Sequence, residues 1–127
     1  MEASPLPELR AELIERLSRA GARFAFLHGS CTTGAARLDS DTDVAAWWGR
    51  NAPAPWDVAL PEGVDLLVLD AAPLELAGRV ALHGVLLLDD DPPARVRWQA
   101  HTRLVYLDEE ERQHRLDRIY RAGRRGG

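Results

Sequence analysis

The sequence predicts a small α/β (α+β) domain, in which helices flank a mixed sheet of short strands. Short apolar runs of strand length alternate with stretches whose leucines recur at helical spacing. The 127 residues suit one domain with one modest core, and 46% of them are hydrophobic, which is typical of a globular chain. We therefore expect a single domain over residues 1–127, with a helical tail over about 92–123.

The first half of the chain predicts a helix, a strand, a turn and a second strand. Residues 6–20 carry Leu9, Leu13 and Leu17 at helical spacing before Gly21, which favours a helix that ends there. Residues 23–28 form a short apolar run and predict a strand, which Gly29 and Ser30 end in a turn. Residues 31–36 are small and could open a short helix, and residues 42–48 predict the second strand.

The second half adds two strands and two helices. Residues 51–61 hold three prolines and predict a loop, and the valines and leucines of 64–69 predict the third strand. A helix is expected over 73–83, with proline in its first turn and Gly84 after its end. Residues 85–88 predict the fourth strand. The tail begins at Pro92 and Pro93, and any interior break is expected near Asp108.

Composition limits the location and partners of the chain. The formal charge of −4 gives no general attraction to nucleic acid. Cys31 is the only cysteine, so neither an intrachain disulfide nor a cysteine-based zinc site can form. The first residues lack the basic and apolar regions of a signal peptide, and no apolar run approaches a membrane span. We expect a cytoplasmic protein without direct membrane or nucleic-acid contact.

The turn after the first strand has features of a phosphate-binding loop. A strand that ends in Gly29-Ser30 before a helical turn exposes backbone N–H groups, which attract phosphate together with the helix dipole. Glycine permits close approach, and Gly34 adds conformational freedom five residues later. The Gly-Lys-Ser/Thr ending of a Walker A loop and the Gly-x-Gly-x-x-Gly spacing are both missing. A bare Gly-Ser turn is more often structural.

Three aspartates are candidate metal ligands. Asp41 and Asp43 are two residues apart, so on a strand both side chains would point to one face. Their mutual repulsion would be relieved by magnesium, which prefers hard oxygen ligands. Asp65 lies within the apolar run 64–69, where an unpaired carboxylate is costly and needs a partner. The alternatives are a solvated acidic loop end for the pair and a first exposed strand position for Asp65.

Taken together, these residues match Gly-Ser-x3-Gly-x5-Ser-Asp-x-Asp, formed by Gly29-Ser30, Gly34, Ser40-Asp41 and Asp43. The pattern resembles the signature of the DNA polymerase β-type nucleotidyltransferase superfamily, and Asp65 is similar to its third carboxylate. The short length resembles the minimal nucleotidyltransferases (MNT), which are mostly the antitoxins of HEPN/MNT toxin–antitoxin pairs.

The resemblance implies a role for each matching residue. Gly29, Ser30, Gly34 and Ser40 would bind the nucleotide triphosphate. Asp41, Asp43 and Asp65 would be the catalytic residues and would hold two Mg²⁺ ions. The implied reaction is transfer of AMP from ATP to a tyrosine of a partner HEPN-type toxin, which neutralises the toxin.

One departure from the family pattern keeps alternatives open. Family members often carry a basic residue in the variable part of the loop, whereas Cys31, Thr32 and Thr33 are uncharged. Either Arg37 reaches in instead, or triphosphate binding is weak. The chain could then be an antitoxin that acts by binding alone. A small-molecule nucleotidyltransferase, for instance one acting on an antibiotic, is a third possibility, although such enzymes usually have an additional domain.

Other residues allow a structural and a functional interpretation. Trp47 and Trp48 could stack on a base, but core and interface packing is favoured. His28 could touch a phosphate, although it is more simply the last residue of its strand. Arginines at 112, 115, 118 and 121 form a stripe that drifts along one helix flank. That flank is either a solvated surface or part of a docking surface.

Overall fold

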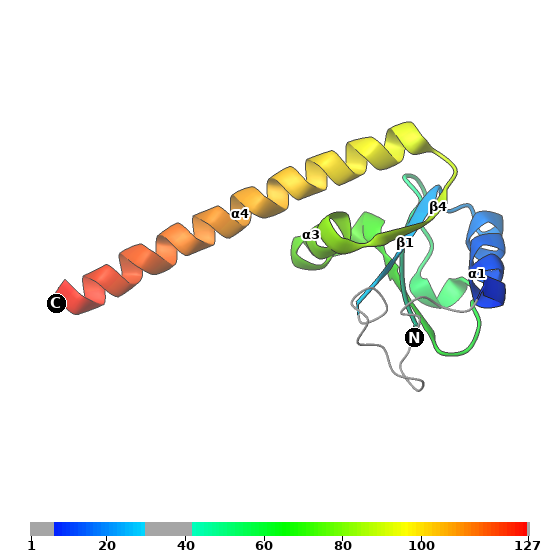
Figure 1. The fold of residues 1–127 in the computed structure, drawn as a ribbon, viewed down its shortest axis with the longest axis horizontal. Coiled ribbons are helices and arrows are strands. Elements are labelled where there is room, and N and C mark those ends of the chain that lie inside the picture. Colours follow the sequence, from blue (N-terminus) through cyan, green and yellow to red (C-terminus); the bar gives the residue numbers. More distant parts are fainter. Residues whose placement is uncertain (1–6, 30–41, 127) are drawn as a thin grey trace.

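The computed structural model describes residues 7–29 and 42–126, with side chains to residue 123. The helices and strands follow one another in the order that the sequence predicts (Figure 1). The strands are β1 (Phe24–His28), β2 (Thr42–Trp47), β3 (Val64–Val68) and β4 (Val85–Asp89). The helices are α1 (Pro7–Arg19), α3 (Leu74–His83) and α4 (Pro92–Gly126), joined by the short 3₁₀ turns η1 (Pro55–Asp57) and η2 (Leu69–Ala71). The short helix expected over 31–36 lies outside the described residues.

The four strands form one mixed sheet in the order β3-β2-β1-β4. Strand β1 pairs antiparallel with both β2 and β4, whereas β2 and β3 are parallel. The two edge strands, β3 and β4, are connected through α3, so this helix must cross one face of the sheet. The predicted mixed sheet is therefore confirmed.

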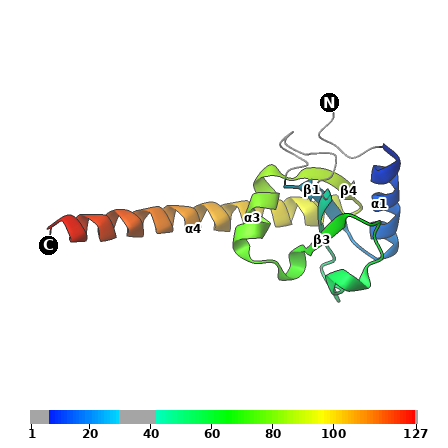
Figure 2. The same ribbon diagram turned by 90° about the horizontal axis from the view of Figure 1, so that it is seen from below.

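Alternating side chains of the strands build a core on each face of the sheet. Ala25 and Leu27 of β1 belong to the cluster that includes Leu13 and Leu17 of α1. Phe24 and Phe26 alternate with these residues along β1, so they point to the other face. There they belong to the cluster with Ala77 and Val80 of α3 and Ala94 of α4. A strand with apolar residues at every position fits a sheet covered on both faces. The result is three layers, with α1 on one side and α3 and α4 on the other (Figures 1 and 2).

The tryptophan pair at the end of β2 belongs to the core. Trp47 stacks on Phe24, its partner in the β1–β2 register, with ring centroids 5.0 Å apart and planes 14° apart. Trp48 is 5% exposed and donates from Nε1 to the Ala20 carbonyl at 2.9 Å. Its backbone N–H donates to the carboxylate of Asp70, as does that of Gly49. The core packing favoured by the sequence is confirmed for both rings, whereas the interface part of that interpretation stays a prediction.

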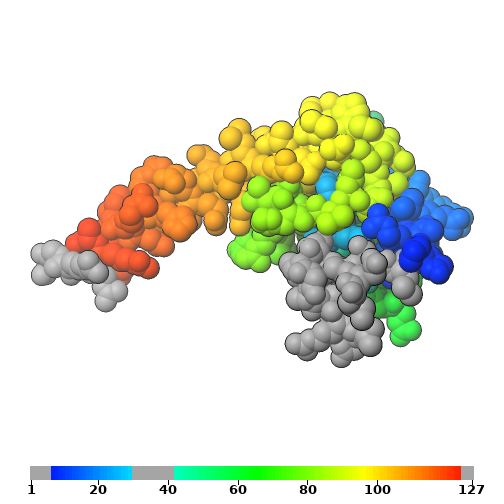
Figure 3. All heavy atoms as spheres, viewed as in Figure 1, coloured from blue at the N-terminus to red at the C-terminus, as the bar shows by residue number. Residues whose placement is uncertain are grey.

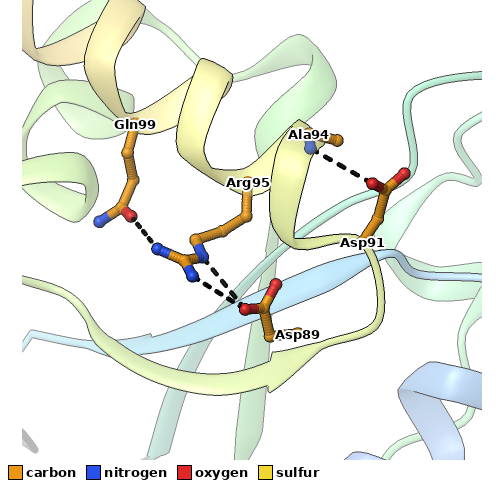
Figure 4. Close-up of polar contacts among 5 residues, drawn as sticks. All are labelled: Asp89, Asp91, Ala94, Arg95 and Gln99. Carbon is orange, nitrogen blue, oxygen red and sulfur yellow. Dashed lines mark hydrogen bonds and ion pairs between the residues drawn. The ribbon is translucent and has the colours of Figure 1, made fainter.

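A hydrogen-bonded junction joins β4 to α4 (Figure 4). Asp91 caps the helix, since its Oδ1 accepts from the backbone N–H of Ala94 at 3.2 Å. Pro92 and Pro93 have no N–H to satisfy, which suits a first helical turn. The Arg95 guanidinium donates to Asp89 at 3.0 Å and to Gln99 at 3.2 Å. These contacts fix the direction in which α4 leaves the sheet.

The structure corrects several predicted boundaries. The proline-rich loop 51–61 contains η1, and Leu69 belongs to η2 rather than to the third strand. Strand β4 extends one residue further, to Asp89. Helix α4 runs through the region of Asp108 without a break. The acidic run there contributes to the helix, because Glu109 pairs with Arg112 at 2.9 Å, three residues along the same helix.

The second half of α4 extends away from the sheet and from α3 (Figure 3). Its proximal half packs on the domain through Trp98, whose ring lies 5.6 Å from that of Phe24, and through buried Thr102. Beyond α3, the large apolar residues Leu116, Ile119 and Tyr120 are exposed. We call this segment, residues 113–123, the arm.

Candidate active site

One cross-strand row of polar side chains lies at the end of the sheet. His28 is the last residue of β1 and pairs with Asp43 of β2. Asp43 in turn pairs with Asp65 of β3. Directly opposite residues on neighbouring strands point to the same face of a sheet, so the three side chains form one polar row. Asp43 and Asp65, 22 positions apart in the sequence, are therefore neighbours.

The alternation of the strands determines which face carries the row. His28 shares its face with Phe24 and Phe26, which pack toward α3 and α4. Asp43 shares a face with Ala45, which belongs to the same cluster, and Asp65 shares a face with Leu67, which packs against that cluster. The polar row therefore lies on the same face of the sheet as this cluster, next to its last apolar side chains.

Gly29 lies directly against the carboxylate of Asp43. Its φ of +75° lies in the left-handed region that favours glycine. A Cβ at this position would lie 2.6 Å from Asp43 Oδ2, too close for any side chain. The glycine therefore allows both the turn after β1 and the close approach of its backbone to Asp43. The sequence predicts that glycine at position 29 lets a phosphate approach the backbone closely. In the structure, the group that lies against Gly29 is the carboxylate of Asp43.

The half-buried His28 has a perturbed protonation equilibrium. Burial lowers its pKa below the ordinary value of 6.5, because a charged imidazole loses solvation. The negative charge of Asp43 and a hydrogen bond with the backbone of Val44 act in the opposite direction but are smaller. His28 is therefore predominantly neutral at neutral pH, and a neutral imidazole can accept as well as donate a hydrogen bond.

The surroundings of Asp65 differ from those expected. The sequence interpretation placed its carboxylate in an apolar setting that required a partner, but the side chain is exposed. The reason is that β3 is an edge strand, which leaves one side of the strand open to solvent. Because the carboxylate of Asp65 is exposed to solvent, it does not need a partner to offset burial. The register of β2 with β3 nevertheless places it next to the carboxylate of Asp43.

Several predicted site residues lie outside the described residues: Ser30, Gly34, Ser40 and Asp41, together with the uncharged positions 31–33. Within residues 7–29 and 42–126, no group of three His, Cys, Asp or Glu side chains is arranged to hold a metal ion. The predicted three-carboxylate site would need Asp41 for its third ligand. The same part of the chain contains no helix that is long and apolar enough to cross a membrane.

The structure adds His28 to the candidate site. Its position directly before Gly29-Ser30 was the only sequence signal, and it did not separate a site residue from an ordinary strand end. The pairing of β1 with β2 supplies the missing information, because it sets His28 opposite Asp43.

Comparison with known proteins identifies the fold. No family model and no curated protein matches the sequence. A toxin–antitoxin complex with AMP-PNP contains a chain 24% identical, with a TM-score of 0.72, over 87% of this chain and 97% of its own. The chain has the minimal-nucleotidyltransferase fold. A MntA-HepT toxin–antitoxin structure is 22% identical over 88% of this chain and 97% of its own, with a TM-score of 0.67.

A third structure with the minimal-nucleotidyltransferase fold comes from a complex of a tri-AMPylated Shewanella oneidensis HEPN toxin with its MNT antitoxin. It is 21% identical over 88% of this chain and 96% of its own, with a TM-score of 0.67. The resemblance found in the sequence motif is thus confirmed at the level of the fold.

Proposed function

We propose that this chain is a magnesium-dependent nucleotidyltransferase of the antitoxin type, which transfers AMP from ATP to a tyrosine of a partner HEPN toxin. The observation that carries the proposal is the register of Asp43 with Asp65 beside the Gly29 turn. It sets two carboxylates next to the start of the motif Gly29-Ser30. The fold supports the same reading, since one neighbour was solved with AMP-PNP and another with an AMPylated toxin.

The donor set of the row suits magnesium. Asp43 and Asp65 offer carboxylate oxygens on one face of the sheet, and these are the ligands that Mg²⁺ prefers. Two adjacent like charges repel each other unless a cation lies between them. The exposure of Asp65 leaves room for water and phosphate oxygens in the remaining positions. With Asp41 as a further ligand, bound magnesium would stabilise charge on the attacking and leaving oxygens.

The residues of the chain would then orient the reactants. Gly29, Ser30, Gly34 and Ser40 would hold the triphosphate. Asp65 would accept the proton of the attacking tyrosine hydroxyl. A bond forms from the tyrosine oxygen to the α-phosphorus, the bond from that phosphorus to the bridging oxygen breaks, and pyrophosphate leaves. Neutral His28 would donate a hydrogen bond within the row, next to Asp43.

A protein substrate needs a surface on which to dock. The arm offers Leu116, Ile119 and Tyr120 in exposed positions beyond α3. Arginines of the same segment flank these residues, and exposed apolar side chains rimmed by charge are typical of protein contact surfaces. This supports a protein partner over a small-molecule acceptor.

A second candidate function is inhibition by binding alone. The uncharged Cys31-Thr32-Thr33 segment favours it, because the triphosphate would lack a cation there. In that case the chain would form a complex with the toxin and block it without transferring a group.

Transfer of label from α-labelled ATP separates these functions. The chain is incubated with magnesium and the product of the adjacent gene, in parallel with Asp41→Ala/Asp43→Ala and Asp65→Asn variants. Asp57→Asn is the matched control, because the exposed Asp57 lies beside α1, which covers the face of the sheet opposite to the row. We expect label on the partner with the unaltered chain and the control only. A stable complex in which the toxin is inhibited but carries no label would establish inhibition by binding alone. Label on an antibiotic added in place of the toxin would establish a small-molecule nucleotidyltransferase.

A further inference from the structure

Helix α4 uses one side to pack on the domain. Ala94 is buried in the core cluster, Trp98 lies against Phe24 and Phe26, and Thr102 is 7% exposed. These residues recur every four positions and therefore lie on one side of the helix. Because each residue turns the helix by about 100°, residues two positions further along lie on the opposite side.

That opposite side carries an apolar stripe whose members belong to neither core cluster. We call Val96, Ala100, Leu104 and Leu107 the outer stripe. Leu104 is 69% exposed, Val96 53% and Leu107 52%, and Ala100 is also exposed. Spacings of four, four and three residues keep the members aligned along the helix. A solvated helix would carry polar residues at these positions, so the stripe needs a covering surface.

The charges around the outer stripe change sign at its C-terminal end, after Leu107. Arg97 precedes Leu104 by two helical turns, and Arg103 is its immediate neighbour in the sequence. Arg103 is exposed, and its Nε–H donates to the Ala81 carbonyl at 2.6 Å. After Leu107 the charges are negative, in the unbroken acidic run 108–111. The surface is therefore basic at one end and acidic at the other, with leucines between the two ends.

We propose that the outer stripe is an interface between two copies of this chain, whose α4 helices pack antiparallel across Leu104 and Leu107. When Leu104 of one copy lies beside Leu107 of the other, Arg103 and Glu110 lie on one flank of the contact and His101 and Asp108 on the other. Arg103 of each copy then faces Glu110 of the other copy, and His101 faces Asp108. Each pair occurs twice, as two-fold symmetry requires. A parallel arrangement would bring the acidic runs together, so charge selects the antiparallel one.

A second copy suits this surface better than an unrelated partner does. The sequence of charges along the helix is complementary to itself when reversed, so one surface supplies both halves of the interface. The interface does not include the His28–Asp43–Asp65 row. Leu116 and Tyr120 of the arm follow Trp98 and Thr102 by five helical turns, so they lie on the side of α4 opposite to the interface. Formation of this dimer can therefore be tested independently of the proposed nucleotide transfer.

Sedimentation velocity of the purified chain over a range of concentrations tests the proposal. We expect a mass that approaches twice the 14.1 kDa of one chain as concentration rises. Leu104→Asp/Leu107→Asp should remain at the mass of one chain with unchanged helical circular dichroism. Leu116→Asp/Ile119→Asp is the matched control, because it alters exposed apolar residues of the same helix outside the outer stripe, and it should still form the dimer.

A charge exchange tests the antiparallel arrangement. Asp108→Arg/Glu110→Arg and His101→Glu/Arg103→Glu should each remain monomeric alone, because each brings like charges together. Mixed in equal amounts, the two variants should form a heterodimer. A chain that is monomeric at every concentration, or a dimer that survives Leu104→Asp/Leu107→Asp, would overturn the proposal. Failure of the mixed variants to associate, while the unaltered chain forms dimers, would overturn the antiparallel pairing.

Discussion

Gly29 is the residue whose replacement most directly perturbs the candidate site. Adding a Cβ in a left-handed conformation costs about 1–2 kcal/mol by itself. At Gly29 the added methyl would also displace the Asp43 carboxylate, from which it would lie 2.6 Å. We therefore expect Gly29→Ala to lower the free energy of unfolding in urea by more than backbone strain alone, and to abolish nucleotide transfer.

Gly63→Ala is the matched control for that substitution. Gly63 has a φ of +84°, close to the +75° of Gly29, but no atom lies within 4 Å of its added Cβ. It should show the backbone cost without the effect on transfer. Equal losses of stability and equal activities in the two variants would contradict the close contact between Gly29 and Asp43.

His28 should make stability depend on pH. Because burial lowers its pKa in the folded protein, the neutral form is favoured by folding. Its contribution is present above the unfolded pKa of about 6.5 and is lost as the pH falls toward the lower folded value. Urea unfolding should therefore show a decline in stability below that pH, and His28→Gln should reduce the decline. An identical pH dependence in the two proteins would exclude His28 as its source.

At the scale of elements, the contact of α3 with α4 depends on the absence of one side chain. A Cβ at Gly78 would overlap the ring of Tyr106. An alanine normally stabilises a helix by about 1 kcal/mol relative to glycine. We expect Gly78→Ala to destabilise instead, in thermal unfolding, because Tyr106 must leave its position. Gly123→Ala in α4, where nothing lies within 4 Å, should be neutral or stabilising. Stabilisation by both substitutions would refute the close packing.

The elements themselves were largely predictable, because each has a local signal. Leucine spacing located α1, and apolar runs located the four strands. The end of β3 was missed, since Leu69 continues the apolar run but is buried in η2 rather than paired in the sheet. The continuity of α4 past Asp108 was uncertain for a related reason. Its acidic run could equally end a helix or pair with the arginines that follow, as Glu109 does with Arg112.

The candidate site was predictable in its residue types but not in its geometry. Asp43 and Asp65 were identified from the motif and the strand pattern. Their adjacency depends on the parallel pairing of β2 with β3 across an irregular connection, which no local pattern encodes. The exposure of Asp65 likewise depends on the position of β3 at the edge of the sheet. The sequence does not identify His28 as a site residue, because only the pairing of β1 with β2 shows that it lies opposite Asp43.

At the scale of the whole molecule, charge is separated between the domain and the end of α4. Residues 112–125 hold six arginines and one aspartate, a formal charge of +5. The preceding residues hold ten arginines and nineteen acidic residues, a formal charge of −9. One helix thus packs on the sheet, offers a self-complementary stripe and carries a basic arm away from the domain (Figure 3). On our proposals, these are separate surfaces for the core, a second copy and a toxin.

Intact-mass spectrometry of the adjacent gene's product, after incubation with ATP, magnesium and this chain, tests the central claim most directly. We expect the partner to gain the mass of one or more adenylyl groups, located on tyrosine by fragmentation. The gain should be absent with Asp43→Asn and retained with Asp57→Asn. A partner that is bound and inhibited by the unaltered chain yet keeps its original mass would contradict nucleotide transfer as the function of the site.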